Sequence, residues 1–195
     1  MKLNQITHIT SGYHSRRRIE HEPKGTHYLL SIGGIDTLTG IVSEDALTVF
    51  TPKLSKNDCI VQENDILLMC RGDRRKAVLV QQVPPNVLVT SSFFVIRTKD
   101  SAEVCSAYIG WYLNQPFTQH FLNRFTGQGV SMPVVRRNVV ENIDIPLPPL
   151  DKQEKISQVY KCIIEEQRLL KTIGEKRFQL AEAVCRESIK DSEKE

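Results

Sequence analysis

The chain has 195 residues, 40% of them hydrophobic and 25% charged, which is enough for one buried domain plus an appendage. No apolar run approaches the ~18 residues of a membrane span, and we expect no signal peptide. Five scattered cysteines without a C-x-x-C pair predict reduced thiols in a cytoplasmic protein without a zinc site. The net charge of +3 lies in residues 1–150, with 16 Lys and Arg against 13 Asp and Glu.

Residues 1–150 are predicted to form a mixed α+β domain. Four short apolar runs are bounded by Gly, Pro, Asn and Asp, as strands are, and they cover residues 27–32, 65–70, 77–82 and 86–98. Residues 103–126 then carry aromatic and aliphatic side chains at helical spacing. We expect two short amphipathic helices there, separated at Asn114-Gln115-Pro116.

Three prolines, Pro146, Pro148 and Pro149, follow in "DIPLPPLDKQEKI". Proline fixes φ and disfavours helix in the residue before it, so this stretch is predicted to be a stiff extended arm. The arm separates a domain of residues 1–150 from a segment of residues 151–195.

The second segment is predicted to be one long helix of about 38 residues, running from Asp151 to about Ile189. Its apolar residues alternate in steps of three and four, while Glu166, Arg177 and Glu187 interrupt the pattern. The helix either folds back on its own domain or pairs with a second helix, and its length favours pairing. We expect pairing through Ile156, Val159, Ile163, Leu170, Ile173, Leu180 and Val184, and the interruptions argue against a long, regular coiled coil.

Signatures of enzymes are missing from the sequence. It contains no G-x-x-x-x-G-K-[ST] phosphate loop and no G-x-S-x-G nucleophile elbow. The five histidines show no metal-ligand spacing. We therefore expect a non-catalytic chain with neither a catalytic residue nor a metal site.

Basic clusters are the positive signal for function. Each one taken alone is slightly better explained as solvated surface than as a DNA contact, whereas three loop-like clusters in one domain shift the balance toward a nucleic acid, which we expect to be double-stranded DNA. Arginine and lysine bind phosphates, and Arg and Gln side chains read base edges. The candidate DNA-binding residues are Arg16, Arg17 and Arg18; Arg71, Arg74, Arg75 and Lys76; and Gln128, Arg136 and Arg137.

Several segments together resemble the specificity (S) subunit of type I restriction–modification systems. They are "NDILLMCRGD", "VTSSFFVIRTKD", "YIGWYLNQPFTQHFLNRFTGQGV" and above all "NIDIPLPPLDKQEKI", in which x-x-Gln-x-x-Ile opens a helix after a proline arm. The resemblance covers about residues 9–184. It matches one target-recognition domain followed by one conserved-region helix. In this family two such helices run antiparallel, so the resemblance implies that the helix pairs as an antiparallel two-helix coiled coil.

The resemblance implies a subunit that recognises one half of a bipartite DNA site. Such a subunit directs an adenine-N6 methyltransferase (M) subunit and a restriction/translocase (R) subunit to that site, and its helix acts as spacer, dimerisation element and methyltransferase platform. No cofactor is expected in this chain, because S-adenosylmethionine, ATP and Mg belong to the partner subunits.

One departure from the family pattern is large. Typical members carry two recognition domains and two helices, whereas this chain has one of each. We therefore expect either a half-subunit that forms a homodimer or a fragment that pairs with another half. The alternative function is a stand-alone dimeric DNA-binding regulator, and a third class is a nuclease or transferase with an unrecognised site.

Overall fold

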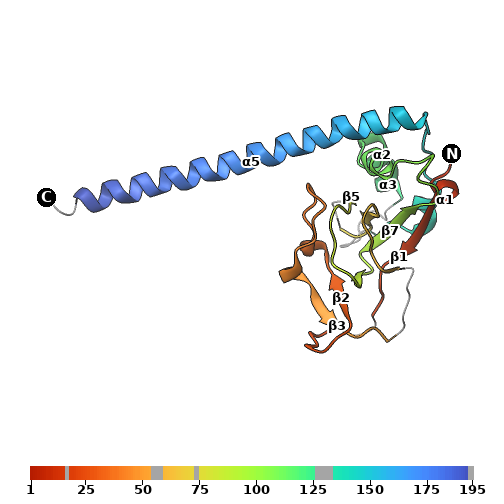
Figure 1. The fold of residues 1–195 in the computed structure, drawn as a ribbon, viewed down its shortest axis with the longest axis horizontal. Helices are drawn as coiled ribbons and strands as arrows, with labels where there is room; N and C mark the ends of the chain where they lie inside the picture. The colour runs from red at the N-terminus through yellow and green to blue at the C-terminus, as the bar shows by residue number, and fades with distance from the viewer. Residues whose placement is uncertain (16–17, 54–58, 73–74, 126–133, 193–195) are drawn as a thin grey trace. The chain divides into compact units, whose positions relative to one another are not determined.

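The computed structural model describes residues 1–15, 18–53, 59–72, 75–125 and 134–192. The chain divides into two compact units, Met1–Gln158 and Val159–Glu195. The first unit is a mixed α+β domain with two sheets, and the second is the continuation of one long helix (Figure 1). The predicted α+β class with a long C-terminal helix is confirmed.

A four-stranded antiparallel sheet forms the centre of the first unit. Its strands lie in the order β1-β7-β4-β5, with β1 at Thr7–Ser11, β7 at Phe93–Thr98, β4 at Ile66–Met69 and β5 at Ala77–Leu79. A second sheet has the order β3-β2-β6, with β3 at Thr48–Phe50, β2 at His27–Leu30 and β6 at Val87–Val89. In this sheet β2 pairs with β3 antiparallel and with β6 parallel.

The central strand β4 is buried on both faces, which explains its unbroken apolar run. Ile66 and Leu68 belong to the core cluster that includes the helices, whereas Leu67 and Met69 belong to the cluster shared with the second sheet. Because neighbouring side chains of a strand point to opposite faces, the four-stranded sheet is the middle layer between helices and the second sheet.

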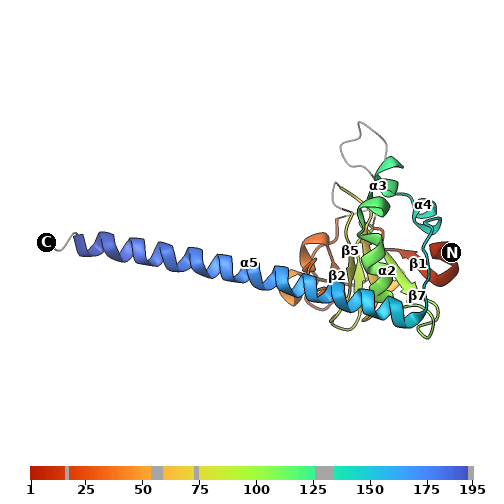
Figure 2. The same ribbon diagram turned by 90° about the horizontal axis from the view of Figure 1, so that it is seen from above.

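The helical layer contains α2 (Ser106–Leu113) and α3 (Pro116–Arg124), with the short α1 (Leu3–Ile6) and α4 (Arg137–Glu141) beside it (Figure 2). Two 3-10 turns, η1 (Ile32–Gly34) and η2 (Glu44–Ala46), connect strands of the second sheet. The predicted break between two short helices is confirmed, because α2 ends at Leu113 and Pro116 opens α3.

All four predicted strand runs contain strands, and the run at residues 86–98 contains two, β6 and β7. The sequence pattern does not predict strands β1 and β3. The sequence of β1, Thr-His-Ile-Thr-Ser, has one aliphatic residue, and β3 has only three residues. Pairing of β1 with β7 makes it a strand despite its weak pattern.

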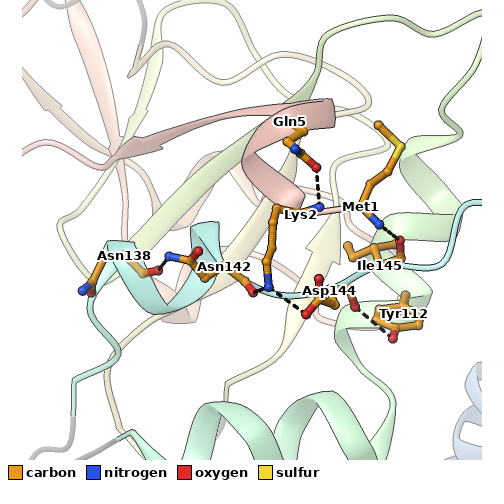
Figure 3. Close-up of polar contacts among 8 residues, drawn as sticks. All are labelled: Met1, Lys2, Gln5, Tyr112, Asn138, Asn142, Asp144 and Ile145. Carbon is orange, nitrogen blue, oxygen red and sulfur yellow. Dashed lines mark hydrogen bonds and ion pairs between the residues drawn. The ribbon is translucent and has the colours of Figure 1, made fainter.

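The predicted proline arm contains no helix, since residues 145–149 have no regular secondary structure, and its start is held by the N-terminal segment. Ile145 exchanges two hydrogen bonds with Met1, since the terminal amine donates to the Ile145 carbonyl at 2.9 Å and the Ile145 amide donates to the Met1 carbonyl at 2.8 Å. The Lys2 ammonium pairs with the Asp144 carboxylate at 2.7 Å (Figure 3). The Tyr112 hydroxyl donates to the Asp144 carbonyl at 3.1 Å. The start of the arm therefore lies against residues from distant parts of the chain.

Helix α5 spans Leu150–Ser192, 43 residues, so it begins one residue earlier and ends later than predicted. Its first turns belong to the first unit. Ile156 is half-buried and packs against the core cluster of that unit, whereas the prediction gave it only a place in the coiled coil.

Beyond Gln158, the other predicted seam residues are exposed, with 61% of Leu170 and 66% of Leu180 accessible. We define the apolar stripe as these exposed residues: Val159, Ile163, Leu170, Ile173, Leu180 and Val184. Along the parts of the chain that the structure describes, no helix has the length and apolar character needed to cross a membrane.

Candidate nucleic-acid interface

The four strands of the central sheet bring loops from separate parts of the chain to one end of the sheet. Ser11 pairs with Phe94, Met69 pairs with Phe93, and Leu68 pairs with Ala77. The ends of β1 and β4 therefore lie level with the starts of β7 and β5. We call this the loop end of the sheet, because the segment after Ser11, the connection from Met69 to Ala77 and the segment before Phe93 all meet there.

Backbone contacts pack these loops closely. The Cys70 amide donates to the Ser92 carbonyl at 2.8 Å, and the Gly12 amide donates to the Phe93 carbonyl at 3.0 Å. A side chain on Gly12 would collide with the backbone of Thr90. Gly72 adopts a φ of +83°, which is why glycine is suited to that turn.

The loop end joins two of the three predicted basic clusters. Arg71 forms an antiparallel bridge with Val134, and the Val135 amide donates to the Cys70 carbonyl at 2.9 Å. Arg136 follows directly, at the N-cap of α4. Arg71 and Arg136 are 65 positions apart in the sequence. They nevertheless lie close to each other in space, because the segment that contains Arg71 pairs with the segment that directly precedes Arg136.

Exposure differs among the predicted DNA-binding residues. Lys76, Arg136 and Arg137 are exposed, and Arg71 is half-buried. Arg137 forms an ion pair with Glu141 within α4, with 2.7 Å between the guanidinium nitrogen and the carboxylate oxygen. Four predicted residues lie outside the described residues: Arg16, Arg17, Arg74 and Gln128.

Arg18, in the first cluster, is exposed. The chain leaves the loop end after β1, and Tyr13 forms a bridge with Thr90. By Ile19 it packs against the small core of the second sheet, beside Phe50 and Leu88. The second and third clusters therefore lie together on one basic surface at the loop end. The first cluster belongs to the segment that follows β1, and β1 ends at the same end of the sheet.

Arg75 differs from the other predicted residues because it is buried, with 6% of its surface accessible. Its guanidinium donates to the side-chain oxygen of Asn123, and its carbonyl accepts a hydrogen bond from Gln119 at 2.9 Å. A side chain in this position cannot reach a DNA phosphate from the surface. We therefore reassign Arg75 to the connection between β5 and α3.

Polar side chains of α2 and α3 fix the position of this connection. The Asn114 side chain bonds both backbone groups of Ala77, accepting at 3.0 Å and donating at 2.7 Å. With Gln119 and Asn123, it ties the start of β5 to the helices. The asparagine that the sequence marked only as a helix break is thus also a positioning residue for the loop end.

Sequence reasoning missed two residues at the end of α3. Arg124 is exposed in the last turn, and Phe125 is 53% exposed at the C-cap. They follow Asn123, which contacts Arg75. An isolated arginine gives no cluster signal, so only the placement of α3 relates it to the loop end.

The electrostatics of the loop end favour an anionic ligand. Among the described residues, no carboxylate forms an ion pair with Arg71, Lys76, Arg124 or Arg136. Burial raises the pKa of the Cys70 thiol, and the nearby Arg71 lowers it by less. A buried neutral thiol is not a nucleophile. Within the described ranges, no group of three His, Cys, Asp or Glu residues lies close enough to hold a metal.

Comparison with known proteins adds the family. The model of the type I restriction modification DNA specificity domain matches residues 1–176. The chain is 30% identical over 107 residues to the type I restriction enzyme MjaVIII specificity subunit of Methanocaldococcus jannaschii. That alignment covers 55% of this chain and 24% of the relative.

Solved structures share the fold. The HsdS subunit from Thermoanaerobacter tengcongensis superposes with a TM-score of 0.63 at 20% identity, over 89% of this chain and 43% of that one. The S subunit from M. genitalium gives a TM-score of 0.58 at 14% identity, over 88% and 40%. This chain thus spans about a quarter of the curated relative and about two fifths of the solved subunits. On the match of its residues 1–176, the chain belongs to the type I restriction modification DNA specificity domain family.

Proposed function

We propose that this chain is the DNA-reading half-subunit of a type I restriction–modification complex. It binds one half of a bipartite DNA site and directs adenine-N6 methyltransferase subunits, together with any nuclease/translocase subunits, to that site. The chain itself makes no covalent change to DNA. Methyl transfer and cleavage belong to its partners.

The observation that carries this proposal is the junction of two basic clusters at the loop end. Lys76 and Arg136 are exposed there, and the described residues supply no carboxylate to pair with them. Lysine and arginine without acidic partners bind DNA phosphates and can contact base edges. In a member of a DNA specificity family, this surface is the best supported position for DNA.

The second unit supports the assembly part of the proposal. Burying a Leu or Ile side chain is worth roughly 1.5–3 kcal/mol, so a partner that covers the apolar stripe gains substantial free energy. A second copy of the chain would bring a second DNA-reading surface. Two identical half-subunits related by a two-fold axis would read an inverted repeat with a gap.

A reconstituted methyl-transfer assay tests the proposal. The chain is mixed with the purified methyltransferase subunit, DNA and labelled S-adenosylmethionine. We expect methylation of adenine only when both proteins are present, because the chain supplies recognition and its partner supplies chemistry. The chain alone should transfer no methyl group.

The matched variant replaces Leu170 and Ile173 by Asp, which puts charge into the apolar stripe without touching the loop end. Loss of dimer and loss of site-specific methylation are expected together. Tight DNA binding by a chain that never co-purifies with the methyltransferase would instead support the stand-alone regulator. Methyl transfer or cleavage by the isolated chain would contradict the proposal.

A further inference from the structure

Two opposite charges interrupt the apolar stripe of α5, and they have no partner within their own helix. Glu166 and Arg177 are both exposed. Neither has an opposite charge three or four residues away, which is the spacing at which helical side chains pair. Along the axis they are about 16 Å apart, because 11 residues rise by ~1.5 Å each.

The other acidic residues nearby behave differently. Glu165 pairs with Arg168 at 2.6 Å, Glu175 with Lys171 at 3.9 Å, and Glu182 with Arg186 at 3.2 Å. These pairs lie outside the stripe. Among the described residues, Glu166 and Arg177 thus stay without an ion pair on the stripe, while these three acidic residues beside it are balanced within the helix.

We propose that α5 pairs with a second copy of itself in one antiparallel register, with Glu166 of each copy against Arg177 of the other. The two-fold axis then passes between residues 171 and 172. This inference rests on the proposed function and deepens it, because it assigns the assembly surface and the residues that select its register.

The register follows from the positions of the stripe residues. A two-fold axis at this point sets Leu170 against Ile173 of the second copy, Ile163 against Leu180, and Val159 against Val184. Every apolar stripe residue therefore meets an apolar one. Each pair also joins an a position to a d position, the layer arrangement that an antiparallel pairing of heptads gives.

Competing registers place charge against apolar side chains. A shift of one heptad sets Glu166 against Leu170 or Val184 of the second copy. The same shift sets Arg177 against Val159 or Ile173. Burying an unpaired charge in an apolar layer is strongly unfavourable, so the charges act against these alternatives.

A parallel pair in register is also disfavoured. It would set Glu166 against Glu166 and Arg177 against Arg177, which creates two repulsive layers. The antiparallel register instead creates two identical Glu–Arg pairs by symmetry. Direction and register thus follow from the same two residues.

Charge reversal in the full chain tests this arrangement. Glu166→Arg and Arg177→Glu, made singly, each turn both attractive pairs into repulsive ones. We expect each to weaken dimerisation by more than about tenfold in sedimentation velocity. The double variant E166R/R177E restores both pairs and should recover the wild-type association.

Mixing the two single variants gives the most specific result. One chain then carries Arg at both positions and the other carries Glu at both, so only the mixed pair is complementary. An equimolar mixture should form heterodimers although each variant alone is largely monomeric. Glu175→Arg is the matched control, since it makes the same charge change outside the stripe and should leave the dimer intact.

Cross-linking checks the register independently. In the proposed pair, Cys162 lies beside Ala183 of the second copy. In a Cys185→Ser background, Ala183→Cys should give a dimer with a short bis-maleimide, whereas Glu182→Cys on the outer face should not. This readout does not depend on the charge variants.

The outcomes separate this inference from the proposed function. A wild-type dimer that the double reversal fails to restore, and whose single variants do not combine, would overturn the register. A monomeric wild-type chain that still directs methylation with another half-subunit would also overturn it, while the proposed function stands. Rescue by the double variant together with heterodimers from the mixture would establish the register, whatever the methylation assay shows.

Discussion

The side-chain amide of Gln153 binds the backbone of Cys105, because its oxygen accepts a hydrogen bond from the Cys105 N–H at 3.0 Å. The nitrogen of the same side chain donates to the carbonyls of Glu103 at 2.9 Å and Pro148 at 2.8 Å. Gln153 is fully buried, so these three bonds fix the first turn of α5 to the first unit. The x-x-Gln-x-x-Ile pattern has a physical basis here, because Ile156 packs against the same core.

Replacing Gln153 by Leu should destabilise the first unit. The change leaves one backbone N–H and two carbonyls without this partner, and a buried unsatisfied group costs about 1–3 kcal/mol. Denaturant unfolding measures the difference. Gln158→Leu, at an exposed position of the same helix, should change stability by less than about 0.5 kcal/mol. Equal effects of the two changes would contradict the role given to Gln153.

The ion pair that holds the proline arm should be visible by titration. The hydrogen bond from Lys2 lowers the pKa of the Asp144 carboxyl below its ordinary value of 3.8. The ionised carboxylate then contributes stability above pH 3.8, and this contribution disappears as the pH falls through the lower pKa of the folded state. NMR titration should show the low pKa in the wild-type chain.

Lys2→Met should return the pKa of Asp144 toward 3.8, since it removes the first and largest cause of the shift. Lys152→Met is the control, because it removes an exposed charge that forms no ion pair with Asp144 among the described residues. An Asp144 pKa that is the same in all three proteins would show that the Lys2–Asp144 pair does not form in solution.

DNA binding through the loop end should depend steeply on salt. The slope of log K against log salt changes by about 0.9 for each phosphate that the protein no longer neutralises. Lys76→Ala and Arg136→Ala should each make the slope shallower by about that amount. Lys99→Gln, at the opposite end of β7, is the control. Unchanged slopes in both loop-end variants would remove these residues from the DNA interface.

Arg75→Met distinguishes two roles of this side chain: direct contact with a DNA phosphate, and structural support of the residues that make such contacts. Because Arg75 is buried against Asn123, we expect the salt slope to stay at the wild-type value. Overall affinity should fall through displacement of the end of α3. Asn123→Ala should reproduce this pattern. A slope reduced by about 0.9 in Arg75→Met would instead show that this side chain reaches a phosphate.

Much of the fold was predictable because its signals are local. The buried run of β4, the break at Asn114–Pro116 and the proline arm each follow from the residues at that position. Strand β1 was not predictable in this way. Its polar sequence becomes a strand only because the distant strand β7 pairs with it.

The site was predictable only in part, for the same reason. Sequence showed basic residues in loops, but burial of Arg75 depends on Asn123 and Gln119 in a distant helix. The bridge between Arg71 and Val134 likewise depends on how a long connection returns to β4. Ile156 matched the helical stripe by spacing, yet its position next to the core assigned it to the first unit.

Sequencing methylated adenines in cells tests the central claim most directly. The cells carry this chain together with its methyltransferase, and the comparison strain lacks only this chain. We predict methylation at an inverted repeat with a gap, present in the first strain, absent in the second, and abolished by the Leu170→Asp/Ile173→Asp variant. A methylation pattern that is unchanged when the chain is removed would contradict its assignment as the DNA-reading subunit.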